Sequence, residues 1–473
     1  MITSDQYSVS KQNIRNLHIK INLLNFSYQT IDSLEGNAIS GSINIDANSD
    51  VRRTCQVQLV VTNSTFDVQA GGKIFLDRYI QIYVGVDNLH TGNIVWFNEG
   101  IYLINQPTYQ YDATTNTLSF AGLDLMSKMT GARNGYLVGT TYEVPQGSDI
   151  RGAIIAVLQL AGFTNYVVET NQTTTEVPIT LDFDQGKTQY DILCGLRDIE
   201  PFHQIYFDVD GVFHYDLIPS GQNENVVIDD STWIPNVISE SIAVDFEGVK
   251  NSIEVYGQSH DIEYYSTATT VSESVLSLTI AGLTTFAQYD MICFTTPSAI
   301  TGNIQLNVNA TGALNLVDLE DNIITALDAN TYYVAAYQVS STNWLFLGHQ
   351  QAYAVYKDTN PQSPFYIGNP AGEIKFVCSG GEYENIQFDE LALERAQYEI
   401  YLRCRLNDTV QLTTIPIYYL DVHQLASYTP KANNSSQITY QYMIQSISFD
   451  LSETGVQTIA LSKYYPAYPV ISS

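Results

Sequence analysis

Hydrophobic and polar residues alternate along the first part of the chain. Alternating segments include residues 43–45, 57–59, 80–84 and 101–104, and turn-forming Gly, Asn and Asp residues separate them. A period of two places one face of a strand in a core and the other face in solvent. Short strands at this spacing are typical of an antiparallel sandwich or barrel, and we assign residues 1–140 to a first tube-like β-barrel.

Helical periodicity replaces this alternation over residues 141–235. Ser148 can cap a helix whose apolar residues share one face until Gly162 ends it. A second short helix is expected to begin at Thr188. The segment IYFDVDGVFHYD then predicts a hairpin that turns at residues 210–211. Together these elements predict a small α+β module.

The remaining chain divides into a host domain and an insertion. Strand patterns over residues 236–260 resume only in residues 350–473, which also contain the one long helical pattern, residues 388–402. Residues 251–356 contain no Lys or Arg, although acidic residues continue through them. This change predicts a second tube-like β-barrel, interrupted by an inserted β-sandwich-like domain over residues 261–349. The predicted fold class is therefore mainly β, with two tube-like antiparallel β-barrels, a small α+β module and an inserted all-β domain.

A short repeat links the first and last β regions. Tyr102-Leu103-Ile104-Asn105 followed by Tyr109 has the same spacing as Tyr442-Met443-Ile444-Gln445 followed by Phe449. Each segment is followed by a turn and a closing strand. A diverged internal duplication and a chance similarity of two hairpins both explain the match.

The charge balance narrows the classes of partner. The 473 residues include 50 acidic and 20 basic side chains, a formal net charge of −30. Such a surface disfavours binding to nucleic acids and to anionic membranes. It is explained either by solubility alone or by a surface that DNA must pass without sticking. The start, MITSDQYSVS, has no signal-peptide pattern, and no apolar stretch is long enough to predict a membrane span.

The usual catalytic motifs do not occur in the sequence. There is no nucleophile elbow, P-loop, zinc-protease motif or dinucleotide-binding glycine pattern. Seven isolated histidines lack the spacing of metal ligands, and five scattered cysteines without a C-x-x-C pair are expected to be free, mostly buried thiols: Cys55, Cys194, Cys293, Cys378 and Cys404. We therefore expect no enzymatic activity, no cofactor and no catalytic, cofactor-binding or metal-binding residue.

Three segments invite a binding function, and each has a plainer explanation. Residues 208–211 resemble the start of a calcium loop, but no Glu stands at the twelfth position, which favours a hairpin turn. Residues 318–321 offer acidic oxygens, and an exposed acidic turn is the favoured interpretation. Four aromatic residues of the insertion can stack on sugars or fill a core: Tyr332, Tyr333, Tyr337 and Trp344.

Longer segments resemble a known family. The run FVCSGGEYENIQFDELALERAQYEIYLRCRLNDTVQLTTIPIYYLDV and the later YQYMIQSISFDLSETGVQTIALSKYYP look like the C-terminal half of bacteriophage tail hub proteins, the tail-associated family that resembles the central baseplate hub of contractile-tailed phages. SDIRGAIIAVLQLAGF and the segments after it are similar to the module between the barrels of that family. The insertion resembles small β modules of phage fibre and tail proteins.

The resemblance implies a structural role at the distal tip of a phage tail in the virion. Such hubs carry two tube-like barrels per chain, so a homotrimer presents six barrels to a hexameric tail tube. The expected partners are further copies of the chain, the tail tube or distal tail protein, and tail fibre or spike proteins. Genome DNA would pass through an acidic lumen without specific binding. The alternative function is host-surface glycan binding through the inserted domain.

Overall fold

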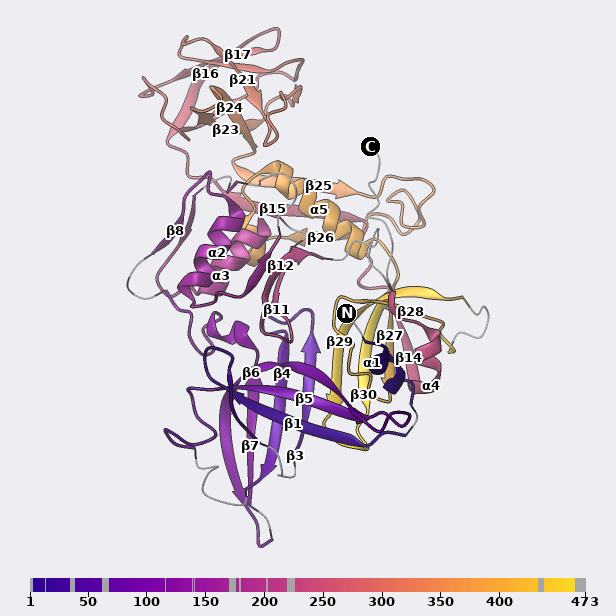
Figure 1. The fold of residues 1–473 in the computed structure, drawn as a ribbon. Helices are drawn as coiled ribbons and strands as arrows, with labels where there is room; N and C mark the ends of the chain where they lie inside the picture. The colour runs from indigo at the N-terminus through magenta and orange to yellow at the C-terminus, as the bar shows by residue number, and fades with distance from the viewer. Residues whose placement is uncertain are drawn as a thin grey trace. The chain divides into compact units, whose positions relative to one another are not determined.

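The computed structural model describes most of the chain (Figure 1). It divides into two compact units, of which the first comprises residues 1–197, 202–248 and 406–472 and the second mainly residues 249–405. The described ranges are 3–12, 14–34, 39–61, 68–114, 116–137, 139, 141–169, 176–177, 180–200, 203–218, 226–432 and 438–463.

The first half of the first unit is an antiparallel sheet. Its strands lie in the order β3-β4-β7-β6-β5-β1-β2, and neighbours in this order are antiparallel. A short helix, α1 (Ser4–Val9), precedes them. The strand bounds are β1 (Leu17–Leu24), β2 (Thr30–Ser33), β3 (Ile39–Asp46), β4 (Arg53–Val60), β5 (Tyr79–Asp87), β6 (Ile94–Tyr111) and β7 (Asn116–Leu123).

The C-terminal half of this unit repeats the arrangement. Its strands lie in the order β14-β27-β30-β29-β28, which matches β3-β4-β7-β6-β5 both in space and along the chain. β13 pairs with β28 in parallel, so the likeness ends there. The bounds are β13 (Val226–Ile228), α4 (Asp230–Asn236), β14 (Val237–Asp245), β27 (Asn407–Thr414), β28 (Leu425–Tyr428), β29 (Tyr440–Asp450) and β30 (Gln457–Lys463).

The two halves also share their strand registers. Cys55 faces Gly122 between β4 and β7, and Val410 faces Leu461 between β27 and β30. Ile43 faces Cys55 in the first half, and Ile242 faces Val410 in the second. When the two halves are aligned on Tyr102 and Tyr442, each pair of the first half coincides with the corresponding pair of the second. The common order and register favour an internal duplication over a chance likeness of two hairpins.

The sequence predicted two separate closed tube-like barrels, but the described strands of this unit do not form them. β29 pairs with β3 as well as with β28 and β30, so thirteen of the described strands belong to one continuous sheet. The physical reason is that β3 lies at the edge of its own half, where its backbone groups need partners. β29 is long enough to pair with β28 through one part and with β3 through the other.

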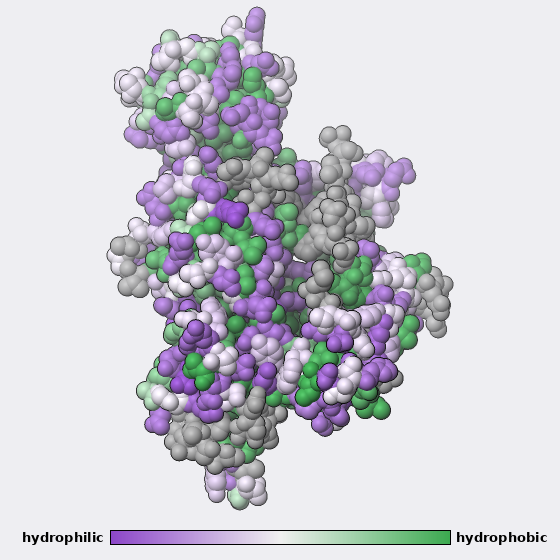
Figure 2. All heavy atoms as spheres, viewed as in Figure 1, coloured by the Kyte–Doolittle hydropathy of each residue, from purple (hydrophilic) through white to green (hydrophobic). Residues whose placement is uncertain are grey.

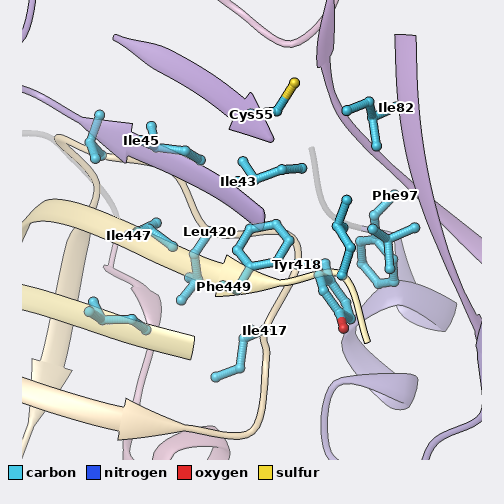
Figure 3. Packing of buried hydrophobic residues seen from close by; sticks show 14 of the residues in the cluster. Ile43, Ile45, Cys55, Ile82, Phe97, Ile417, Tyr418, Leu420, Ile447 and Phe449 are labelled. Carbon is cyan, nitrogen blue, oxygen red and sulfur yellow. The ribbon is translucent and has the colours of Figure 1, made fainter. Parts of the chain in front are cut away.

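A single core lies along one face of this sheet (Figure 3). Ile43 and Ile45 of β3 pack in the same cluster as Ile447 and Phe449 of β29, and Tyr418 belongs to it as well. Burying an aliphatic or aromatic side chain of this size contributes about 1.5–3 kcal/mol. The core therefore spans both halves and helps to hold them together.

The α+β module follows the prediction with two local differences. Helix α2 (Ile150–Leu160) is capped by Asp149 and not by Ser148, because the Asp149 carboxylate accepts a hydrogen bond from the Gly152 N–H at 2.8 Å. The hairpin turn occupies residues 208–212, which is longer than the two residues expected. The other elements are β8 (Tyr142–Val144), β9 (Tyr166–Val168), β10 (Leu181–Phe183), α3 (Gln189–Asp198), β11 (His203–Phe207) and β12 (Phe213–Leu217).

Helix α5 and a small sheet form part of the second unit. α5 (Asp389–Arg403) packs on β25 (Gln351–Lys357) and β15 (Ser252–Ser259), and the sheet order is β25-β15-β26, with β26 at Lys375–Cys378. The buried Glu399 forms ion pairs with Arg395 and Arg403. This long helix confirms the helical pattern of residues 388–402.

The insertion forms a closed barrel and not a sandwich. Its order is β16-β17-β20-β21-β24-β23-β18, and β16 closes the ring because it pairs with both β17 and β18. Trp344 and Leu306 are buried inside it. The bounds are β16 (Tyr264–Ser272), β17 (Val275–Ile280), β18 (Met291–Thr295), β20 (Gln305–Val308), β21 (Ala313–Val317), β23 (Tyr332–Gln338) and β24 (Asn343–Gly348), and β19 (Ile300–Thr301) pairs with β22 (Ala326–Leu327).

No helix in the described parts of the chain is long and apolar enough to cross a membrane.

The barrel leaves and rejoins its host at neighbouring points, because Ser259 of β15 faces Gln351 of β25. We predict that replacing residues 262–348 with Asn-Gly, a pair suited to a tight hairpin turn, leaves the other elements folded. The expected result is an unchanged thermal unfolding midpoint for the first unit, measured by calorimetry, with loss of the barrel's own contribution. Aggregation of the shortened chain or unfolding of its remainder contradicts the prediction.

Candidate functional site

The calcium-like loop is a hairpin turn. Asp208 accepts hydrogen bonds from the backbone N–H groups of Asp210 and Val212 at 2.9 and 2.8 Å, and its other oxygen lies 3.1 Å from Nε2 of His214. The bond to Asp208 raises the pKa of His214. The carboxylate is thus engaged within its own hairpin, as the turn interpretation requires.

The acidic loop of the insertion is organised in the same way. Asp318 accepts hydrogen bonds from the backbone N–H groups of Glu320 and Asn322 at 2.9 and 2.8 Å. Across the residues that the structure describes, no group of three or more His, Cys, Asp or Glu side chains is placed to hold a metal ion.

Most of the aromatic residues singled out in the insertion belong to its core. Trp344 and Tyr333 are buried, and Tyr337 packs against both Trp344 and Phe286. Tyr332 is exposed. The core interpretation therefore accounts for three of the four, and no cluster of exposed aromatic rings at these positions supports sugar stacking.

The five cysteines are free thiols, as predicted. Burial raises the pKa of Cys293 and of Cys378 to about 11, and that of Cys404 to about 12. A thiol with so high a pKa stays protonated at neutral pH and is a poor nucleophile. Cys55, buried in the core of the first unit, has its pKa raised further by the same effect.

The most informative feature for function is the junction between β3 and β29. Five residue pairs join them, from Ser446 opposite Asp46 to Asp450 opposite Ser42. The core-facing side chains at this junction are almost completely shielded: Ile45 is 2% exposed and Phe449 is 3% exposed. The junction thus shows how one half of the chain docks, edge to edge, onto the other.

Strand β14 is the counterpart of β3, and its outer edge is open. Among the described strands it pairs with β27 alone. Val244 occupies the place of Ile45 and is 45% exposed, compared with 2% for Ile45. Ile238 and Phe246 are also exposed. An exposed, apolar strand edge of this kind is a site for pairing with another chain.

In the first half, the C-terminal part of β6 corresponds to the segment of β29 that pairs with β3. Residues 108–111 pair with β7 on one side after an irregularity at residues 106–107, and the β5 pairing ends at Leu103. Tyr111 is 78% exposed, whereas its counterpart Leu451 is 1% exposed. The hydroxyl of Tyr109 accepts a hydrogen bond from the Val68 N–H at 2.8 Å. Each half thus has the same two docking edges, and the internal junction occupies one edge from each half.

Surface hydropathy alone does not reveal these edges. Figure 2 shows apolar side chains interspersed with polar ones across the visible face. No candidate residue from the sequence lies on β14, because the alternation that predicts a strand does not say which strands end up at an edge. In the sequence, the usable signal for these edges was the repeat that places Tyr109 of one hairpin at the position of Phe449 in the other.

An ion pair between a buried arginine and a partly exposed aspartate ties the two halves together beside this junction. Arg53 of β4 forms an ion pair with Asp421, which precedes β28, and the Arg53 backbone N–H donates to the Asp124 carboxylate at 2.9 Å. The attraction of Asp421 opposes the effect of burial and keeps the pKa of Arg53 high. Arg52 donates to the Gln204 side chain at 2.8 Å, which joins the α+β module to the same cluster.

Glu99 is a buried carboxyl group close to Arg53. Its side chain is 3% exposed, and one carboxylate oxygen has no hydrogen-bond partner. Burial raises its pKa to about 8, although the nearby Arg53 works in the opposite direction. Burial also raises the pKa of Asp124, to about 6. With a pKa of about 8, the Glu99 carboxyl group is mostly protonated at neutral pH.

Comparisons with solved structures identify the fold. The structure matches the 43 kDa tail protein of prophage MuSo2 from Shewanella oneidensis with a TM-score of 0.51 and 12% identity, over 94% of this chain and 98% of that one. A tail protein from Neisseria meningitidis MC58 matches with a TM-score of 0.49 and 9% identity, over 95% and 98%. The prophage tail protein gp18 from Listeria monocytogenes EGD-e matches with 0.44 and 10%, over 94% of each chain.

The match to the MuSo2 protein means that the chain has the fold of a phage tail protein over nearly its whole length. This confirms, for the fold, the resemblance drawn from the sequence. The model of a family described as a domain of unknown function (DUF5048) matches residues 362–468, which include α5 and strands β27 to β30. No curated protein matches the sequence.

The buried Glu99 yields a prediction about pH. Since folding raises its pKa from an ordinary 4.5 to about 8, the folded state loses stability as the pH rises through this interval. We expect Glu99→Gln, which mimics the protonated acid, to be more stable than the natural protein at pH 8 by a few kcal/mol, at up to about 1.4 kcal/mol per pKa unit.

Urea unfolding at a series of pH values measures this difference, which should widen from pH 5 to pH 8. Glu143→Gln, at an exposed position of β8, is the matched control and should leave the profile unchanged. Parallel pH profiles for Glu99→Gln and the natural protein would contradict the assignment.

Proposed function

We propose that this chain is a structural, non-enzymatic subunit of a hub at the distal tip of a phage tail. The shared fold with the MuSo2 43 kDa tail protein, over nearly the whole of both chains, supports this proposal. The hub joins the hexameric tail tube to the host-facing apparatus and encloses the channel through which DNA leaves the virion. Its partners are further copies of itself, the tail tube or distal tail protein, and fibre or spike proteins.

The observation that carries the proposal is the pair of open edges. The chain contains one completed β3–β29 junction together with the two counterpart edges needed to make another, β14 and residues 106–111 of β6. When β14 of one copy pairs with β6 of the next, the same junction forms between chains. Repetition of this contact is head-to-tail, and it gives a closed ring if the rotation closes.

A ring of this kind explains why one chain holds two halves. Each half supplies one tube-like segment, so three copies supply six segments and match a six-fold tube. Along the chain, most of the second unit is inserted between β14 and β27, whereas the corresponding strands β3 and β4 are joined by a short turn. It therefore occurs once per chain and three times per ring, which suits attachment of a three-fold fibre or spike.

The register of the internal junction predicts the register between copies. Asp450 faces Ser42 in the internal junction, and their counterparts are Gln110 and Ser241. Residues directly opposite each other in antiparallel strands have Cβ atoms about 4.5–5.5 Å apart, close enough for a disulfide after a small adjustment.

We predict that the double variant Gln110→Cys with Ser241→Cys forms disulfides between copies after mild oxidation. Gel electrophoresis without reductant should show a ladder that ends at three chains, and mass measurement of the oxidised assembly should confirm that number.

Two controls make the test specific. Ser42→Cys with Asp450→Cys places the same pair in the internal junction and should give a disulfide within single chains. Gln110→Cys with Ser239→Cys is displaced by two residues and should cross-link poorly. Equal cross-linking of both Gln110 variants, or no ladder while the internal control oxidises fully, would refute the proposed ring.

A further inference from the structure

One carboxylate holds the linker through which the chain leaves the inserted barrel. Asp389, the first residue of α5, accepts hydrogen bonds from the backbone N–H groups of His349 and Tyr353 at 3.0 and 2.8 Å. Nδ1 of the His349 ring lies 2.6 Å from the same carboxylate. His349 follows β24, the last strand of the barrel, and Tyr353 belongs to β25 of the host. The side chain of Asp389 therefore joins α5 to the boundary between barrel and host.

The packing around Asp389 fixes this boundary closely. Gly348 ends β24 with a φ of 95°, and a Cβ atom at this position would collide with the Asp389 side chain. Glycine is therefore needed both for the backbone conformation and for the close approach. The linkers into and out of the barrel are also joined, because the His260 N–H donates to the Gln350 carbonyl oxygen at 2.9 Å. Both chain crossings are thus fastened beside α5.

The His349 ring bridges the barrel and its host. Its centroid lies 5.4 Å from that of Tyr333 in β23 and 5.9 Å from that of Tyr353 in β25. The side chain is 41% exposed, so it can exchange protons with solvent. The hydrogen bond to Asp389 raises the pKa of His349, the charges of Asp389 and Asp328 act in the same direction, and partial burial opposes them. Protonation of this ring therefore strengthens its bond to Asp389.

Carboxylates from several segments crowd the same contact. They lie on α5, in the acidic loop of the barrel and after α3, at Glu390, Glu394, Asp318, Glu320 and Glu200. Desolvation and the charges of the acidic loop raise the pKa of Glu390, although its carboxylate also accepts a hydrogen bond from the Leu319 N–H. Glu394 keeps contact with solvent, yet desolvation by its surroundings and the charges of the neighbouring glutamates raise its pKa to about 7. Residues 251–356 supply no Lys or Arg to offset this repulsion.

We propose that the Asp389–His349 contact is a proton-sensitive latch, which seats the inserted barrel against α5 and releases it as the pH rises through neutrality. A group whose pKa is raised on seating stabilises the seated state at low pH and loses this effect as the pH rises through its raised value. The loss begins above the ordinary pKa of 4.5 for Glu390 and Glu394 and above 6.5 for His349. All three groups therefore weaken the latch in the same direction. The latch belongs to the second unit alone and does not depend on the proposed ring.

One neighbouring histidine titrates in the opposite sense. His260 is 4% exposed, and its Nε2 atom has no hydrogen-bond partner. Burial lowers its pKa below the ordinary value of 6.5, while the backbone of Gln387 and the charge of Asp389 act in the other direction. Protonation of His260 therefore loosens the contact only in acid, below this value. At pH values above 6.5 the ring is mostly neutral in both states, so the latch can be followed there without interference from His260.

Spin labels test the latch in the complete chain. Ser277→Cys in β17 of the barrel and Val377→Cys in β26 of the host place labels at exposed positions, and the distance between them is measured by pulsed electron spin resonance. The five native thiols are buried or half-buried, and the chain without added cysteines measures their background labelling. We expect one narrow distance at about pH 6.5 and loss of that narrow peak by about pH 8.5.

Three further variants, each made in the labelled chain, assign the effect. Asp389→Asn removes the charge of the latch and should lack the narrow peak at both pH values. His349→Gln keeps a side-chain donor but cannot titrate, so the change between the two pH values should be smaller. Glu384→Gln, at an exposed position of the same unit, is the matched control and should behave like the natural chain.

A narrow peak that persists at both pH values in the otherwise natural chain would overturn the latch. An undiminished response in His349→Gln would overturn it as well. Circular dichroism checks that each variant is folded, and if Asp389→Asn does not fold, the response of His349→Gln decides the question.

Discussion

The pairing of β3 with β29 is the interaction on which the rest of the first unit depends. It connects segments about four hundred residues apart and turns two similar sheets into one. Since β3 is an edge strand, its unpaired backbone groups would otherwise need water or another chain. The same contact aligns the cores of both halves, so that Ile45 and Phe449 are shielded in one cluster.

The duplication also explains where the second unit is inserted. In the first half, β3 and β4 are joined by residues 47–52, whereas the corresponding strands β14 and β27 are separated by residues 246–406. A hairpin turn at the surface tolerates insertions because its ends are already held close together by the strands. The barrel is inserted in the same way, because the chain leaves and rejoins the second unit where the paired strands β15 and β25 hold the two ends close together. Nested insertions of this kind add new surfaces without disturbing the sheet.

Local features were predictable from the sequence because neighbouring residues decide them. Alternation predicted the strands, and the Thr188–Asp191 pair marked the start of α3, where the Thr188 backbone N–H donates to the Asp191 carboxylate at 2.6 Å. The prediction of a turn at Asp208 was confirmed, because Asp and Gly favour such turns. The predicted sandwich-like insertion was wrong in architecture, since closure of the barrel depends on the pairing of β16 with β18, which no local pattern encodes.

By itself, then, the sequence determined the mainly β class, the α+β module, the insertion and the repeat around Tyr102 and Tyr442. Only the tertiary structure decided that the two halves share one sheet and that β14 and β6 keep open edges. The physical reason is that a strand pattern specifies which side chains face a core. It does not specify which distant strand supplies the hydrogen-bonding partner, and that choice is made by the packing of the whole chain.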